Sequence, residues 1–241
     1  MSNKVTIHRL ATGVPGLDAI LGGGLPEFSF NLIIGTPGSG KTTLAHQIMF
    51  ALATVERPAL YFTVLGEPPL KMLRYQQQFA FFDAEKINAS IRFVNLSDDV
   101  SSGNFDKVLA RITEEVEAFS PALVFVDSFR SAILEAGRQT QGSLNLQQFI
   151  QQLGIHLSGW QATTFLIGEY ASESNPPAVF TVADGLLSLE QRVSRNSMVR
   201  KLQILKMRGQ ATRPGMHTFR ITSAGIEVFP AAIVRDDSGA R

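Results

Sequence analysis

The fold of this chain is decided by one stretch, Phe30-Asn31-Leu32-Ile33-Ile34-Gly35-Thr36-Pro37-Gly38-Ser39-Gly40-Lys41-Thr42-Thr43. The apolar run Phe30–Ile34 predicts a buried strand, and periodic apolar residues over Lys41–Ala53 predict a helix. Between them the loop satisfies the pattern Gly-x-x-x-x-Gly-Lys-Ser/Thr. A strand, such a loop and a helix in this order indicate an α/β fold.

This loop pattern is typical of a phosphate-binding site. Glycines let backbone N–H groups and the helix N-terminus approach a phosphate closely. Lys41 would add a charge between the β- and γ-phosphates of a nucleotide, and the Thr42 hydroxyl would ligate Mg²⁺. A plain glycine-rich turn is the alternative, but the bare pattern arises by chance in only roughly 1% of chains this long. We therefore predict that ATP and Mg²⁺ are held by Gly35, Thr36, Pro37, Gly38, Ser39, Gly40, Lys41, Thr42 and Thr43.

Strands and helices alternate along most of the chain, which predicts a mostly parallel twisted sheet with helices on both faces. The strands are expected at Phe30–Ile34, Leu60–Val64, Ile91–Val94, Leu123–Val126 and Phe165–Ile167. The helices are expected at Lys41–Ala53, Pro69–Phe81, Asn104–Phe119 and Leu144–Trp160. Beyond residue 184 the pattern turns to antiparallel strands, at Gly185–Arg192, Met198–Met207, Met216–Ile221 and Gly225–Phe229.

Length and composition narrow the class of protein. The 241 residues suit one domain over residues 1–241, with residues 235–241 as a flexible tail. The absence of cysteine excludes disulfides, thiolate catalysis and Cys-ligated metals. Because no secretory signal and no run of about 18 apolar residues occurs, a cytoplasmic protein without a membrane segment is expected.

Two carboxylates follow apolar strands and are candidates for the chemistry. Asp127 ends the run Leu123–Val126 and would bind the metal at the carboxyl edge of the sheet, unless it only caps the next helix. Glu67 follows Leu60–Val64 and would orient or deprotonate the attacking water, unless it caps the helix that begins near Pro69.

Four motifs in order resemble the KaiC branch of the RecA superfamily of ATPases. They are Thr12-Gly13-Val14-Pro15-Gly16-Leu17-Asp18, Leu21-Gly22-Gly23-Gly24-Leu25-Pro26, the phosphate loop, and Ile204-Leu205-Lys206-Met207-Arg208-Gly209. The resemblance runs from about Arg9 to Phe229 and implies a RecA-like ATPase, usually assembled as a six-membered ring with ATP between neighbours. It also implies that Lys206 and Arg208 reach the γ-phosphate bound by the next subunit.

The basic segment supports that role on its own terms. Residues 191–220 carry eight basic and no acidic side chains, which predicts an anionic partner. Along a strand, residues i and i+2 share one face, so Lys206 and Arg208 could meet one phosphate. A solvated cationic strand face is the alternative.

The chain departs from the family pattern in three respects. Clock-type members have two tandem domains and this chain has one, so it is expected to be either a single-domain relative or part of a longer protein. The family commonly has two adjacent glutamates after the second strand, whereas this chain has Gly66-Glu67, which suggests slow turnover. Clock-type members carry a phosphorylated Ser-Thr pair, and the matching stretch here is Phe180-Thr181, so autokinase activity is doubtful. Glu169 resembles a family position that senses the γ-phosphate, although a simple strand-end acid is equally compatible.

Three functions remain open. The leading hypothesis is an ATP-hydrolysing ring that signals to a partner protein. The second is a nucleotide-gated scaffold with little turnover. The third is a DNA-dependent recombinase-type ATPase, which is disfavoured because the candidate DNA loops, Arg130–Ser143 and Tyr170–Ala183, have almost no net positive charge.

Overall fold

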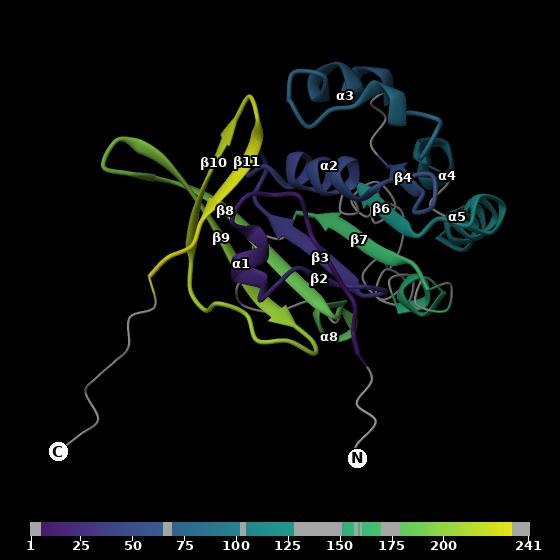
Figure 1. The fold of residues 1–241 in the computed structure, drawn as a ribbon. Helices are drawn as coiled ribbons and strands as arrows, with labels where there is room; N and C mark the ends of the chain where they lie inside the picture. Colours follow the sequence, from purple (N-terminus) through teal and green to yellow (C-terminus); the bar gives the residue numbers. More distant parts are fainter. Residues whose placement is uncertain are drawn as a thin grey trace, which may run out of the picture.

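The predicted α/β architecture is confirmed in a computed structural model, which describes residues 6–64, 69–101, 105–127, 151–156, 159, 161–169 and 179–232 (Figure 1). Nine strands among these residues form one sheet in the order β11-β10-β9-β8-β3-β7-β6-β4-β5. The strands from β8 to β5 run parallel, and β9, β10 and β11 extend the sheet as antiparallel neighbours. The strands are β1 (Arg9–Leu10), β2 (Leu25–Pro26), β3 (Phe30–Gly35), β4 (Ala59–Thr63), β5 (Ile91–Asn95), β6 (Leu123–Asp127), β7 (Thr163–Gly168), β8 (Gly185–Ser194), β9 (Ser197–Met207), β10 (His217–Thr222) and β11 (Gly225–Phe229).

Helices cover both faces of the sheet because its central strands are apolar on both sides. One apolar cluster joins the sheet to α1 and α2, and a second joins the opposite face to α5 and to helical residues 151–156. The alternation within β3 shows the two faces, since Ile33 belongs to the first cluster and Leu32 to the second. The helices are α1 (Leu17–Leu21), α2 (Lys41–Leu52), α3 (Pro69–Gln76), η1 (Ala84–Lys86), α4 (Ser97–Ser101), α5 (Phe105–Phe119) and α8 (Val179–Val182).

The helix predicted over Pro69–Phe81 is shorter than expected, because α3 ends at Gln76. The Ala80 N–H donates to the Ser223 carbonyl in the β10–β11 turn, at 2.8 Å. Phe82 packs against Phe50 of α2, with ring centroids 5.0 Å apart. Tertiary contacts within the chain thus end the helix and partly bury apolar side chains that the sequence pattern alone would place on a longer helix.

Two predicted segments lie wholly or partly outside the described residues. The helix expected at Leu144–Trp160 is seen only through residues 151–156 and 159, which are helical. The tail expected at residues 235–241 lies outside the described part of the chain. Within that part, no helix is long and apolar enough to cross a membrane.

The N-terminal motif holds α1 and its loop against the sheet. The Asp18 carboxylate accepts hydrogen bonds from the Thr12 N–H at 3.0 Å and from the Thr12 hydroxyl at 2.7 Å. Gly16 has a φ of 77°, and a Cβ there would lie only 1.9 Å from the Val228 carbonyl oxygen of β11. The motif therefore fixes how closely the N-terminal segment packs on the far edge of the sheet.

Candidate functional site

The phosphate loop leaves the carboxyl end of β3 and enters the first turn of α2 at Lys41. Gly35 has no room for a side chain, because a Cβ there would lie 2.0 Å from the Leu189 carbonyl oxygen of β8. The Gln191 amide, also from β8, donates to the Pro37 carbonyl at 3.1 Å. Strand β8 thus supports the loop from one side.

Two hydroxyls in the loop have no hydrogen-bond partner in the part of the chain that the structure describes. Thr36 Oγ1 and Ser39 Oγ are buried and accept or donate no hydrogen bond within the described residues. A buried hydroxyl without a partner costs about 1–3 kcal/mol. Phosphate oxygens at the helix N-terminus would supply acceptors for such groups, so the loop fits an anionic ligand.

Lys41 lies folded over its own loop. Its ammonium donates to the Thr36 carbonyl oxygen at 2.8 Å, and its side chain is largely buried. Burial lowers the pKa of Lys41, and the nearby charges of Glu169 and Asp127 act in the opposite direction. The ammonium therefore sits in a confined space beside two carboxylates.

Asp127 ends β6 and accepts two hydrogen bonds on one carboxylate oxygen. Thr42 Oγ1 and the Tyr61 hydroxyl both donate to Asp127 Oδ2, each at 2.7 Å. Burial raises the pKa of Asp127, whereas these two hydrogen bonds and the charge of Lys41 lower it. Since β7 separates β6 from β3 in the sheet, the fold brings Thr42 and Asp127 together across a strand.

The pair formed by Thr42 and Asp127 fits a magnesium ion. Mg²⁺ prefers hard oxygen ligands and binds through a hydroxyl and one or two carboxylates together with phosphate oxygens. Here a hydroxyl and a carboxylate converge at the start of α2, where the phosphates would lie. Within the described ranges, no cluster of three or more His, Cys, Asp or Glu side chains offers an alternative metal site.

The other predicted carboxylates have different outcomes. Glu169 directly follows β7, is half-buried, and is close enough to influence Lys41 and Asp127 electrostatically. Glu67 lies outside the described residues. Strand β4 ends at Thr63, which is paired with Asp127, so β4 and β6 end at the same level of the sheet.

Tyr61 is a site residue that sequence reasoning missed. It lies in the apolar strand β4, where the sequence pattern predicts a core side chain, and its ring is fully buried. Burial raises the pKa of its hydroxyl, with the neighbouring Asp127 charge acting the same way, so the hydroxyl stays a donor. Its position in the strand could have indicated this contact. Tyr61 and Thr63 share one face of β4, and Thr63 pairs with Asp127, so the Tyr61 side chain lies on the same face as the end of β6.

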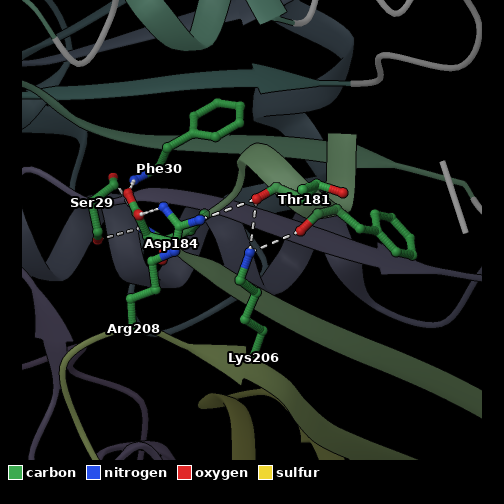
Figure 2. Close-up of polar contacts among 8 residues, drawn as sticks. Ser29, Phe30, Thr181, Asp184, Lys206 and Arg208 are labelled. Carbon is green, nitrogen blue, oxygen red and sulfur yellow. Dashed lines mark hydrogen bonds and ion pairs between the residues drawn. The ribbon is translucent and has the colours of Figure 1, made fainter. Parts of the chain in front are cut away.

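The structure brings Lys206 and Arg208 together beside α8 (Figure 2). Lys206 donates to the carbonyl oxygens of Phe180 and Thr181, both at 3.0 Å. Arg208 donates to the same Thr181 oxygen at 3.2 Å and forms an ion pair with Asp184 at 3.0 Å. Burial lowers the pKa of Lys206, and the adjacent Arg208 charge adds to that effect. The two cations thus share one carbonyl acceptor.

This cationic pair lies near the amino ends of the parallel strands, whereas the phosphate loop of the same chain lies at their carboxyl ends. Asp184 accepts a hydrogen bond from the N–H of Phe30, the first residue of β3, whereas the loop begins at the last residue, Gly35. Five strand residues separate the two levels by about 17 Å. Lys206 and Arg208 therefore lie far from the loop of their own chain.

Part of the positive charge of residues 191–220 is paired within the chain. Arg208 is paired with Asp184, and Arg220 with Glu227 at 2.7 Å. Both arginines remain more than half exposed, with side-chain exposures of 58% and 62%. They therefore keep donors available for a further anion.

The fold and the loop define this chain as a RecA-like P-loop protein. The model of the KaiC ATPase family matches residues 10–233, and the chain belongs to that family. The resemblance inferred from the four motifs is thereby confirmed.

Relatives of two kinds are found. A UPF0273 protein of Methanopyrus kandleri is 26% identical and covers 98% of this chain and 97% of its own length. The circadian clock oscillator protein KaiC of Picosynechococcus sp. is 27% identical over 95% of this chain, which spans only 46% of that protein. The crystal structure of the KaiC-like protein PH0186 from Pyrococcus horikoshii OT3 matches with a TM-score of 0.80 and 26% identity, over 93% of this chain and 100% of that one.

Proposed function

We propose that this protein is a Mg²⁺-dependent ATPase that acts as a ring, with each ATP site completed by the neighbouring subunit. The observation that carries the proposal is the convergence of Lys41, Thr42 and Asp127 at the start of α2. Family membership supports nucleotide hydrolysis. We further propose that residues 1–241 act as one ATPase domain and that the protein works in the cytoplasm.

Each residue has a role that follows from its chemistry. Loop N–H groups and the Lys41 ammonium would bind the phosphates, which requires Lys41 to exchange the Thr36 carbonyl for a phosphate oxygen. Thr42 and Asp127 would hold Mg²⁺, which neutralises charge on the phosphates. Glu67 would orient the attacking water and accept its proton.

Lys206 and Arg208 would stabilise the charge that develops on the γ-phosphate of the adjacent subunit. Their separation from the loop of their own chain supports an action between subunits rather than within one. To contact a phosphate, the two cations would use donors that do not contact Asp184 and the α8 carbonyls, or exchange those contacts. A ring with hydrolysis coupled to subunit contacts follows from such a shared site, and a partner protein could read its state.

A scaffold that binds ATP with little turnover is the second candidate. The observation that favours it is Gly66, which leaves Glu67 as the single carboxylate where the family commonly has two. Such a protein would assemble when it binds ATP and would disassemble slowly, because the bound ATP is hydrolysed slowly. Both candidates share the same binding site and differ only in the rate of hydrolysis.

The test measures ATP binding by calorimetry and ATP hydrolysis at steady state. Lys41→Ala should lose most ATP affinity, because a charge-assisted contact to two phosphates is removed. Lys107→Ala, an exposed lysine on α5, should bind like the wild type. Unchanged ATP affinity in Lys41→Ala would refute the nucleotide site. Binding without turnover would select the scaffold, and stimulation by single-stranded DNA would select the recombinase-type ATPase.

A further inference from the structure

Tyr61 is a buried polar group that the proposed chemistry does not yet use. Its side chain has an exposure of 0%, and its hydroxyl donates to Asp127 Oδ2 at 2.7 Å. A phenylalanine would fill the same space in β4 without this contact. The hydroxyl therefore acts on Asp127 and not only on the packing of the core.

The two hydroxyl donors reach Asp127 from different elements. Thr42 donates from the first turn of α2, and Tyr61 donates from β4, next to β6 in the sheet. A carboxylate oxygen has two lone-pair directions, so both directions of Oδ2 are occupied. Donors from two sides fix the rotation of the carboxylate about its Cβ–Cγ bond.

The ring of Tyr61 is itself held in place by aromatic neighbours. Its centroid lies 4.6 Å from His46, 5.4 Å from Phe93 and 5.8 Å from Phe125. His46 follows Thr42 by four residues on α2, so both lie on one helix face. One face of the helix thus supplies the first hydroxyl donor and supports the ring that carries the second.

We propose that Tyr61 is a positioning residue for the Mg²⁺ that Thr42 and Asp127 would hold. When the Thr42 hydroxyl turns a lone pair to the metal, the Tyr61 hydroxyl keeps the carboxylate oriented. Without the Tyr61 hydroxyl, only Thr42 donates to Asp127, and the metal itself has to complete the ordering of the carboxylate. This inference rests on the proposed Mg²⁺·ATP site and adds a residue to it.

The test is the gain in ATP affinity that Mg²⁺ produces, measured by calorimetry on the full chain in excess Mg²⁺ and in EDTA. Tyr61→Phe should reduce this gain about tenfold, the low end of the effect of losing a hydrogen bond to a metal ligand. The ATP affinity in EDTA should stay near the wild-type value, which reports a folded loop. Tyr75→Phe removes a hydroxyl from an exposed tyrosine on α3 and should change neither affinity.

A double-mutant cycle separates positioning from a purely structural role. On an Asp127→Asn background, Tyr61→Phe should cause a much smaller further loss of the Mg²⁺-dependent gain, because both changes act on one carboxylate. A wild-type gain in Tyr61→Phe, or the same tenfold loss in both backgrounds, would overturn the proposal. If the wild type itself showed no gain with Mg²⁺, the proposed metal site would fail instead.

Discussion

At the residue scale, the site depends on charges placed in a confined space. Lys41 and Asp127 are both largely buried, and Glu169 acts on each of them. Isolated buried charges are costly, but an ammonium beside carboxylates offsets much of that cost. The arrangement holds two carboxylates and one cation where a metal and phosphates would meet.

The first prediction concerns Glu67, which lies outside the described residues. Glu67→Gln keeps the size of the side chain but cannot accept a proton from water, so kcat should fall roughly 100-fold while ATP binding persists. Steady-state hydrolysis and calorimetry measure the two effects. Glu56→Gln, an exposed glutamate after α2, should behave as the wild type. Wild-type turnover in Glu67→Gln would assign the role to another acid, with Glu169 as the next candidate.

The second prediction concerns the dependence of stability on pH. Burial lowers the pKa of His46 to about 3, while the Gln76 side chain acts in the opposite direction. The unfolded chain takes up a proton near pH 6.5 and the folded chain does not, so stability falls as the pH drops from 6.5 towards 3. His46 alone should contribute a loss of about 2 kcal/mol between pH 7 and pH 5.

Chemical denaturation at the two pH values measures this loss. His46→Gln has no titrating ring, so its stability should change less between pH 7 and pH 5 than that of the wild type, by about the same 2 kcal/mol. The difference between the two proteins cancels the contributions of the other histidines. An equal loss in both proteins would mean that His46 is protonated in the folded state.

At the element scale, α2 is the element that connects the site to the rest of the sheet. Its first turn carries the phosphate loop, and the Lys86 ammonium donates to the carbonyl oxygens of Phe50 and Ala53 at its last turn. In between, the Gln47 amide accepts from the Ile226 N–H at 2.6 Å and donates to the Ile226 carbonyl at 3.2 Å. The Gln47 amide thus pairs with backbone groups of the edge strand β11 that would otherwise bond to a further strand.

The third prediction tests this contact between α2 and β11. Gln47→Leu leaves the N–H and the carbonyl of Ile226 buried and unpaired, so the free energy of unfolding should fall by about 2 kcal/mol or more. Urea denaturation measures it. Gln77→Leu, an exposed position after α3, should change stability by less than about 0.5 kcal/mol. Equal effects of the two substitutions would show that water reaches Ile226 in the variant.

At the scale of the whole molecule, the two halves of the proposed site lie at opposite ends of strand β3. The phosphate loop follows β3 at its carboxyl end, whereas Lys206 and Arg208 lie beside the amino end of the same strand. Figure 1 shows the antiparallel strands β10 and β11 at one end of the molecule and α5 at the other. A head-to-tail arrangement of copies would bring the two halves of the site together, and such contacts form a ring when the rotation between copies closes.

The fourth prediction tests this arrangement by mixing two inactive proteins. Lys41→Ala lacks a working loop, and Lys206→Ala/Arg208→Ala lacks the cations. Mixed assemblies contain contacts that pair an intact loop with intact cations, so hydrolysis should recover and should rise with protein concentration.

The control is a variant that carries all three substitutions, mixed with either parent, which offers no intact pair and should stay inactive. If hydrolysis does not recover in assemblies that native mass measurement shows to be mixed, Lys206 and Arg208 bind an anion other than the γ-phosphate of a neighbouring subunit. Nucleic acid would then return as a candidate.

Much of the fold followed from local patterns in the sequence. Strand β3, the phosphate loop and α2 were predicted within one residue of their observed ends, because apolar periodicity and glycine placement act over a few residues. The parallel sheet and its antiparallel extension were predicted for the same reason and are confirmed. The spacing of apolar residues indicates which face of each helix or strand is buried.

Other features depended on contacts between distant segments. The end of α3 at Gln76 is set by Ser223 and Phe50, and no local pattern contains those partners. The strand order places β7 between β3 and β6, which decides that Thr42 and Tyr61 share Asp127.

From the sequence alone, the identity of the loop, its phosphate chemistry and the candidates Lys41, Thr42 and Asp127 could be stated, because each depends on residue type and short spacing. The tertiary structure decided which oxygen of Asp127 is occupied, that Tyr61 joins the site, and that Lys206 and Arg208 lie beside Asp184 at the amino end of β3. The physical reason is that hydrogen bonds and ion pairs require directions and distances within a few tenths of an ångström. Only the packing of α2, β4 and β6 on one another sets those distances.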